Sequence, residues 1–408
     1  MTKIAVADEA ELAQTAQAPS GATELSPAAI LLIQLALAVG GFGIGTGEFV
    51  IMGLLPDVAA TYGVSIPAAG YVITAYALGV VVGAPIIAVL SARLRRRTLL
   101  LGLMAVFAVG NILSALAPDF ISFTTLRFLT GLPHGAYFGV AALVAASVVP
   151  LQYRARAVST LLMGLTVATV IGVPIVTAVS HAFGWRWAFA GAAFCALVTM
   201  AVVALFAPRD PAEAGASPMR ELGALKRPQV WLTLGVSAIG FGGMFAVYAF
   251  LASTLTAVTG VSAAVMPWVF AVFGVGMFAG NLIGAWAADR FGYRAAVGLL
   301  LLSAASMALY PFAAPHLPAM LVVVVLIGGT GGLGSVLQTR LMDVAGEAQT
   351  LAAALNHSAF NTANAIGPFL GGLAIAAGFG WTSSAWVGVV LALGGAAIWF
   401  VSWRLGTR

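Results

Sequence analysis

The chain has 408 residues, of which 61% are hydrophobic and 8% are charged, against roughly 25% charged residues in an ordinary soluble domain. A water-soluble fold always exposes much of its surface and cannot hide so many apolar side chains, so the composition excludes a soluble protein. The net charge of +5 comes from positive residues between the apolar segments, and it gives no reason to expect nucleic acid as a partner.

Twelve apolar segments follow one another along the chain, and each reaches the roughly 20 residues that a helix needs to cross a bilayer. Lipid satisfies no backbone hydrogen bonds, and the segments lack the alternation of β-barrel strands, so they are expected to be helices. The predicted fold class is an all-α membrane protein with twelve transmembrane helices. The segments lie near residues 28–55, 69–90, 98–117, 120–149, 157–183, 187–207, 230–257, 265–288, 294–313, 317–342, 351–379 and 383–403.

Polar stretches divide the chain into a tail, two bundles and a linker. Residues 1–26 are expected to form a disordered cytoplasmic tail, and residues 208–229 a cytoplasmic linker between six-helix bundles at 27–207 and 230–408. With the N-terminus in the cytoplasm, every Lys and Arg except Arg127 and Arg186 falls on the cytoplasmic side or in the tails. The positive-inside rule therefore predicts that both termini are cytoplasmic.

The two bundles share an internal repeat. One constant shift along the sequence superposes Gly79 on Gly276 and Gly83 on Gly280, together with the apolar segments. Two related halves around a central site are typical of transporters that work by alternating access. The sequence has no Gly-x-x-x-x-Gly-Lys-Ser/Thr loop for ATP and no His-Glu-x-x-His or Gly-x-Ser-x-Gly pattern, so we expect no enzyme.

A loop between two spans of the second half carries a recognisable motif. The segment GAWAADRFGYR contains Asp289, Arg290, Gly292 and Arg294 in the order of an Asp-Arg-x-Gly loop motif. The equivalent first-half loop, AVLSARLRRR, keeps Arg93 but has alanine where the motif has aspartate. The first half therefore lacks the carboxylate that this motif would place in the loop, and any contact made by that carboxylate.

Glycine and proline motifs mark the fifth and eleventh spans. MGLTVATVIGVP contains Gly172 and Pro174, and NAIGPFLGG contains Gly367 and Pro368. Such residues either let helices pack closely or let them bend. Together with GTGEFVIMGLLP, RFLTGLPHGAYFG and the loop motif, these segments resemble the major facilitator superfamily, and within it the twelve-helix drug/proton antiporters of the arabinose-efflux and chloramphenicol-resistance branch.

The resemblance implies a fold of two pseudo-symmetric six-helix bundles in a bacterial inner membrane. It implies a proton-coupled antiporter that exports a drug or sugar-like compound by alternating access, acting as a monomer without a cofactor or metal. Its partners would be a small-molecule substrate, protons and the lipid bilayer. A proton-coupled importer or facilitator, and a non-transporting membrane sensor of the same fold, remain alternatives.

Two ionisable residues lie well inside the spans, where a charge costs roughly 2.5–3.5 kcal/mol on insertion scales. Glu48 lies about 20 residues along the first span and Arg127 about 7 along the fourth, so at about 1.5 Å per residue both reach the outer half of the membrane. In the resembling family these two helices face the central cavity, which suggests a Glu48–Arg127 pair. Glu48 would be the principal proton carrier and Arg127 its modulator, or the two would form a permanent structural bridge.

Two further titratable groups are candidates for proton coupling. His134 shares a helical face with Arg127 and could titrate near neutral pH, or it could be a neutral hydrogen-bonding group. Asp57 follows a proline at the outer end of the first span. It is either a second proton site or an exposed acidic residue at a helix end.

The second half offers polar and aromatic stripes instead of charges. His357, Asn361 and Asn364 lie on one face of the eleventh span, where they either contact substrate or join helices by hydrogen bonds. The seventh span carries a stripe that forms either ordinary packing or an apolar wall of the substrate pocket. Its members are Phe241, Phe245 and Tyr248.

Overall fold

The computed structural model describes residues 25–90, 94–208, 225–345 and 349–406. Within these residues, twelve helices are long and apolar enough to cross a membrane, which confirms the predicted fold class. The first half consists of α2 (Pro27–Tyr62), α3 (Ile66–Ala69), α4 (Tyr71–Leu90), α5 (Arg96–Leu116), α6 (Phe120–Gly131), α7 (His134–Ser147), η1 (Leu151–Tyr153), α8 (Arg154–Val167), η2 (Ala168–Gly172), α9 (Val173–Phe183) and α10 (Arg186–Phe206). The second half consists of α12 (Pro228–Gly240), α13 (Gly242–Thr254), η4 (Leu255–Thr259), η5 (Ala263–Val265), α14 (Met266–Phe291), α15 (Arg294–Ala313), α16 (Leu317–Gly329), η6 (Thr330–Gly332), α17 (Leu333–Ala345), α18 (Gln349–Ala374), η7 (Ile375–Phe379) and α19 (Ser383–Gly406).

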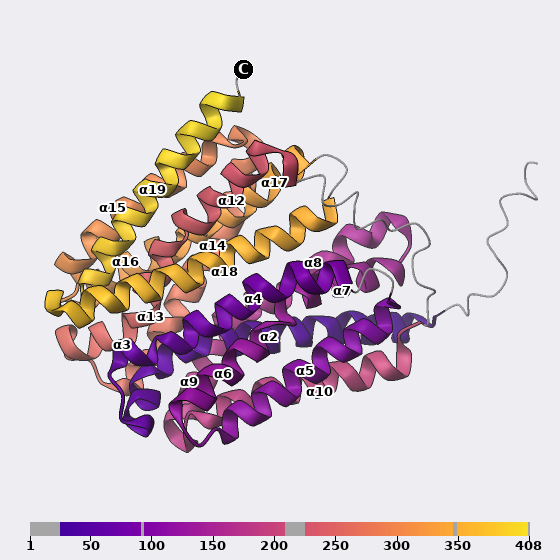
Figure 1. Ribbon diagram of the computed structural model, residues 1–408, viewed down its shortest axis with the longest axis horizontal. Helices are drawn as coiled ribbons and strands as arrows, with labels where there is room; N and C mark the ends of the chain where they lie inside the picture. Colours follow the sequence, from indigo (N-terminus) through magenta and orange to yellow (C-terminus); the bar gives the residue numbers. More distant parts are fainter. Residues whose placement is uncertain (1–24, 91–93, 209–224, 346–348, 407–408) are drawn as a thin grey trace, which may run out of the picture.

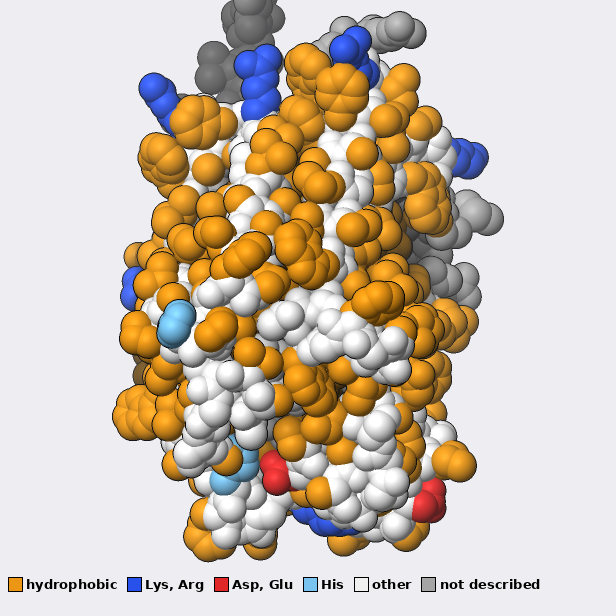
Figure 2. Space-filling view, turned by 90° about the vertical axis from the view of Figure 1, so that its left-hand side faces the viewer, with side chains coloured by type: hydrophobic (Ala, Val, Ile, Leu, Met, Phe, Trp, Pro, Cys, Tyr) orange, Lys and Arg blue, Asp and Glu red, His pale blue; other side chains and the backbone are white. Residues whose placement is uncertain are grey.

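The outside of the bundle is apolar. Large hydrophobic side chains face outward along its length, and Ile121 and Phe312 are 78% and 73% exposed. In Figure 2 hydrophobic side chains cover most of the visible face, and the few charged side chains lie mainly toward its edges. A surface of this kind is stable only against lipid, since water penalises contiguous exposed apolar area.

The fourth and tenth spans are each interrupted near their middle. In the fourth, α6 ends at Gly131 and α7 begins at His134 after Pro133, whose ring nitrogen carries no hydrogen to continue the helical ladder. In the tenth, the tight turn η6 separates α16 from α17. The interruption in the fourth span matters for function, because it lies between Arg127 and His134.

Glycines bring the second and fourth helices of each half into backbone contact. A Cβ atom at Gly83 would lie 2.1 Å from the carbonyl oxygen of Leu132, and one at Gly280 would lie 2.1 Å from that of Gly329. The predicted repeat pairs Gly83 with Gly280, and the contacted residues Leu132 and Gly329 are related by the same shift. Both halves therefore use the same helix crossing, α4 on α6 and α14 on α16.

The two halves lie side by side, the indigo-to-magenta helices against the red-to-yellow ones (Figure 1). The helices α2, α4 and α7 of the first half pack against α13 and α18 of the second, and α9 packs against α14. One continuous cluster of buried apolar residues contains members of both halves, including Phe49 and Phe245. We call this contact region the seam.

Residues 25, 208, 225 and 406 lie at one end of the bundle, here called the linker end, because an even number of spans separates them. The opposite end carries α3 and is called the α3 end. At the seam near this end, the rings of Tyr71 and Phe369 lie 6.1 Å apart.

Replacing Gly280 with alanine tests the helix crossing. The added methyl group meets backbone rather than a mobile side chain, so we expect a loss of about 1–3 kcal/mol of stability and a lower melting temperature of the detergent-solubilised protein. Gly298→Ala is the matched control, because a Cβ atom at Gly298 meets nothing within 4 Å. Equal melting temperatures for the two variants would contradict the crossing.

Candidate functional site

The seam contains a buried carboxylate. Glu48, on α2, is 2% exposed, and no other acidic side chain of the described residues is buried. Its Oε1 accepts a hydrogen bond of 3.0 Å from Nδ2 of Asn364, on α18. The bond joins the two halves, because α2 belongs to the first and α18 to the second. Together with a 3.2 Å bond from Thr74 Oγ1 to the carbonyl oxygen of Ala365, it is one of two side-chain hydrogen bonds that cross the seam within the described chain.

Arg127 lies beside this carboxylate without pairing with it. The side chain is fully buried, and its Nη2 donates a 3.1 Å hydrogen bond to the carbonyl oxygen of Gly47. Its guanidinium lies 4.1 Å from the centre of the Tyr76 ring, a cation–π contact. The direct Glu48–Arg127 pair expected from the sequence is therefore not formed. The guanidinium instead stacks on the Tyr76 ring and donates to the carbonyl oxygen of Gly47.

His134 connects the carboxylate to a tyrosine. Its Nδ1 lies 3.9 Å from Glu48 Oε2 and 2.9 Å from the hydroxyl oxygen of Tyr76, on α4. All three side chains are at most 2% exposed. Because His134 is the first residue of α7, the break after α6 turns its ring toward both neighbours. The first half thus contributes Glu48, Tyr76, Arg127 and His134 to one cluster, here called the charge cluster.

The eleventh span faces this cluster from the second half. The ring of His357 stacks on Phe138 at 5.3 Å and lies 6.4 Å from the ring of His134. Asn361 Nδ2 donates to the carbonyl oxygen of His357 in its own helix, at 3.1 Å. The polar stripe of α18 therefore lies on the seam. Asn364 is its member with a described hydrogen bond across the seam.

The aromatic stripe of the seventh span forms an apolar wall next to Asn364. Phe245 stacks on Phe49 across the seam at 6.3 Å, and Tyr248 stacks on Phe273 at 4.1 Å. Phe241 contacts Phe360 edge-on at 5.2 Å. The three stripe residues are at most 2% exposed, so their rings pack against the seam and do not line an open pocket in this conformation.

Several buried polar atoms at this level have no hydrogen-bond partner. They include Nε and Nη1 of Arg127 and the side-chain oxygens of Thr46, Asn361 and Asn364. An unpaired buried polar group costs about 1–3 kcal/mol. Arg127 lies on α6 of the first half and Asn361 and Asn364 on α18 of the second, so each half has buried polar atoms that a polar ligand or water would satisfy.

Asp57 lies apart from the charge cluster, toward the α3 end of α2. Its side chain is 46% exposed, and its Oδ2 lies 3.7 Å from Nε2 of His181. Of the acidic residues predicted for proton coupling, it is the one that solvent reaches.

The motif residues occupy helix ends and close crossings. Asp289 and Arg290 are exposed at the end of α14, where Gly292 has a φ of 55° that favours glycine, and Arg294 begins α15. Arg93 lies outside the described residues.

The glycines of the fifth and eleventh spans pack against the first helix of their own half. A Cβ atom at Gly172 would lie 2.4 Å from Thr46 Oγ1, and one at Gly367 would lie 2.1 Å from the carbonyl oxygen of Gly242. Pro174 is the second residue of α9, just after the π-helical turn η2, and Pro368 lies inside α18.

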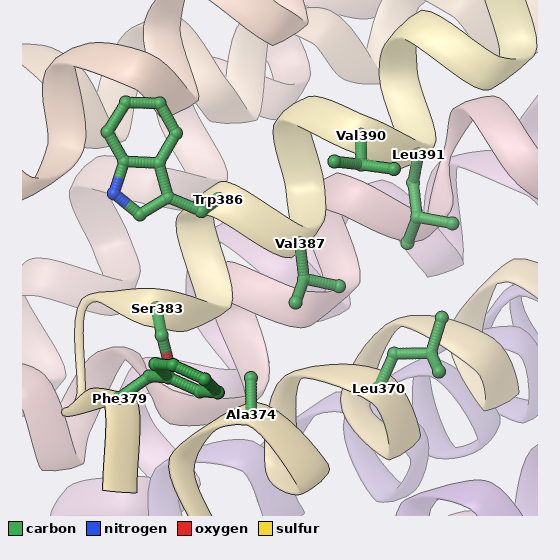
Figure 3. Close-up of a pocket in the computed structure, with 8 residues that line it drawn as sticks. All are labelled: Leu370, Ala374, Phe379, Ser383, Trp386, Val387, Val390 and Leu391. Atoms are coloured by element: carbon green, nitrogen blue, oxygen red, sulfur yellow. The ribbon is translucent and has the colours of Figure 1, made fainter. Parts of the chain in front are cut away.

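An apolar groove of about 520 Å³ lies elsewhere, between α18 and α19. Its walls include Leu370 on one helix and Val387 and Val390 on the other (Figure 3). Trp386 and Val390 are 49% and 70% exposed on the lipid-facing surface. None of the residues predicted to bind substrate or protons lines this groove, so the charge cluster at the seam is the candidate site.

Tyr76 joins this site without having been predicted. A single tyrosine in an apolar segment has no distinguishing spacing. One feature of the sequence could have indicated that Tyr76 is buried. It lies four residues after Val72 and three before Gly79, on the face where α4 meets α6.

The sequence matches the family model described as Major Facilitator Superfamily over residues 37–257 and 233–406. It is 42% identical to the inner membrane transport protein YdhP of Escherichia coli (strain K12), over 88% of this chain and 92% of that protein. It is 34% identical to a chloramphenicol resistance protein of Streptomyces lividans, over 82% and 86% of the two chains.

The fold is similar to the crystal structure of a bacterial homologue of the human lysosomal transporter Spinster, in an inward-facing and unoccupied conformation. The TM-score is 0.69 at 18% identity, and the match covers 93% of this chain and 98% of the other. At this identity the likeness concerns the fold alone.

Replacing Asn364 with leucine tests the bond across the seam. Glu48 then loses its only described hydrogen-bond donor, so we expect the halves to separate more often at the α3 end. Spin labels at positions 60 and 257, in a background with Cys195→Ser, report that separation as a broader and longer distance distribution. Asn361→Leu is the control, because Asn361 bonds only its own helix. An unchanged distribution in Asn364→Leu would argue against this role.

Proposed function

We propose that this chain, which belongs to the Major Facilitator Superfamily and is therefore a membrane transporter rather than an enzyme, is a proton-coupled antiporter that exports a small molecule. One observation carries the proposal: the carboxylate of Glu48 is buried at the seam and bonded across it to Asn364. In this site, a proton changes the interaction that joins the two halves.

The physical argument starts from the cost of burying charge. An ionised carboxylate in an apolar seam needs hydrogen-bond donors, and Asn364 supplies one across the seam. Charge-assisted hydrogen bonds are roughly twice as strong as neutral ones, so protonation of Glu48 weakens this bond. Each conformation then has its own preferred protonation state, which is what proton coupling requires.

Arg127 and His134 act as modulators in this proposal. Arg127 places a fixed positive charge near Glu48, and two of its nitrogens, Nε and Nη1, have no hydrogen-bond partner. His134 faces the carboxylate at 3.9 Å. Asp57, half exposed and beside His181, is assigned a minor part at the α3 end.

Substrate contact is assigned to the second half. Asn361 and Asn364 present buried unpaired oxygens, and His357 lies beside them on the same helix. Phe241, Phe245 and Tyr248 form the apolar wall next to this polar stripe. Amides next to aromatic rings suit an amphipathic molecule with hydroxyl or amide groups, and the relative named for chloramphenicol resistance supports a substrate of this class.

We assign topology and direction from the charge pattern, a sequence motif and the relatives. The excess of Lys and Arg at the linker end supports cytoplasmic termini, and YdhP supports the inner membrane of a bacterium. We assign bundles at 27–207 and 230–408 that rock about the seam, with residues 208–229 as linker. Export rests on the Gly/Pro motif of the fifth span, including Gly172 and Pro174, and on the relative named for drug resistance.

Reconstitution separates antiport from the alternatives. Proteoliposomes that contain a pH-sensitive dye are mixed with external chloramphenicol, then with other antibiotics and sugars. In antiport, substrate entry expels protons and raises the luminal pH, whereas symport lowers it. A facilitator moves substrate without a pH change, and a sensor moves neither. A pH fall or no pH change for every transported compound would contradict antiport.

Replacing Glu48 with glutamine tests the proton site in the same vesicles. Glutamine keeps the shape and still accepts a hydrogen bond from Asn364, but it cannot exchange a proton. We expect proton-driven transport to be lost while substrate exchange at equal pH persists. Asp57→Asn is the comparison variant and should retain proton-driven transport. Coupled transport by Glu48→Gln at normal protein levels would disprove the assignment.

A further inference from the structure

Tyr76 occupies the centre of the charge cluster. It is 1% exposed and projects from α4, whose backbone is held in place by Gly131 of α6: a Cβ atom there would lie 2.2 Å from the carbonyl oxygen of Tyr76. One face of its ring meets the guanidinium of Arg127 at 4.1 Å, and its hydroxyl lies 2.9 Å from His134 Nδ1. The ring and the hydroxyl therefore contact two different partners.

The direction of the Tyr76–His134 hydrogen bond follows from satisfaction of polar groups. Nδ1 of His134 is the one hydrogen-bond partner described for the Tyr76 hydroxyl. If Nδ1 carried the hydrogen, the buried O–H of Tyr76 would lack an acceptor, which is unfavourable. The tyrosine therefore donates and Nδ1 accepts, so that neutral His134 carries its hydrogen on Nε2.

This tautomer affects Glu48. The same Nδ1, now without a hydrogen, faces Glu48 Oε2 at 3.9 Å. Its lone pair is already taken by the Tyr76 hydroxyl, so Nδ1 offers Glu48 no N–H donor, and an ionised carboxylate that lacks a donor is disfavoured relative to the protonated form. We propose that Tyr76 is a positioning residue that, by donating to His134 Nδ1, stabilises the protonated form of Glu48.

The inference rests on the proposed function in one respect, namely that Glu48 is the group that binds the proton. Two other charged or titratable groups lie near it, Arg127 and His357. Arg127, on α6, is a positive charge whose guanidinium bonds the carbonyl oxygen of Gly47, the residue before Glu48. His357, on α18, faces His134 with ring centres 6.4 Å apart. Neither contacts the Tyr76 hydroxyl, so removal of that hydroxyl isolates its effect.

The test is an infrared titration of Glu48 in the purified protein. The C=O stretching band of its protonated carboxyl is identified as the band that Glu48→Gln removes, and its intensity is followed against pH without substrate. In Tyr76→Phe the ring still covers Arg127, but His134 is free to place its hydrogen on Nδ1, facing Glu48. The loss of one hydrogen bond should move the midpoint to lower pH by about 0.5 to 1 unit.

Two further variants show whether the effect passes through His134. In a His134→Gln background, Tyr76→Phe should shift the midpoint little. Tyr310→Phe, which removes the hydroxyl of a buried tyrosine on α15 in the second half, should leave it unchanged.

The outcomes separate this inference from the proposal beneath it. An unchanged or raised midpoint in Tyr76→Phe overturns the role of Tyr76 alone, as does an equal shift in the presence and absence of His134. A Glu48 band that never appears at any pH at which the protein is folded overturns the proton site itself, and with it both proposals.

Discussion

The burial of one carboxylate constrains how the two halves meet. Glu48 can lie in the apolar seam only if polar groups surround it, and they come from three other helices of the first half, α4, α6 and α7, and from α18 of the second. The bond to Asn364 is the part of this environment that the second half supplies. The solvation of Glu48 and the contact between the halves therefore depend on each other, and the proposed proton coupling rests on this dependence.

The two halves use one architecture for different tasks. Their second and fourth helices cross in the same way, at Gly83 and Gly280, so the scaffold is repeated. The positions that carry charge are not repeated, since the residues of the second half related to Glu48 and Arg127 are Phe245 and Val324. Charge stays on one side of the seam, whereas amides and rings occupy the other, so a substrate between them meets both.

The sequence predicted the spans well because hydrophobic length is a direct physical requirement of the bilayer. It also indicated that polar groups such as Asn364 face inward, since they must avoid lipid. It could not predict partners. Depth along a helix placed Glu48 and Arg127 at one level in the membrane, but it did not fix the direction of either side chain. In the structure the guanidinium of Arg127 packs on the ring of Tyr76. Tyr76 itself was missed because a tyrosine in an apolar helix has the same pattern as ordinary packing.

The backbone contact between α4 and α6 sets which distances stay constant during transport. Gly83 and Gly131 leave no room for these helices to slide, so Tyr76 and Arg127 travel as one rigid body. Asn364 and His357 belong to the other half, so their separations from Tyr76 and Arg127 change in the proposed rocking motion. Two spectroscopic probes placed on α4 and α6 would therefore report a constant distance. Two probes placed one in each half would report a distance that changes.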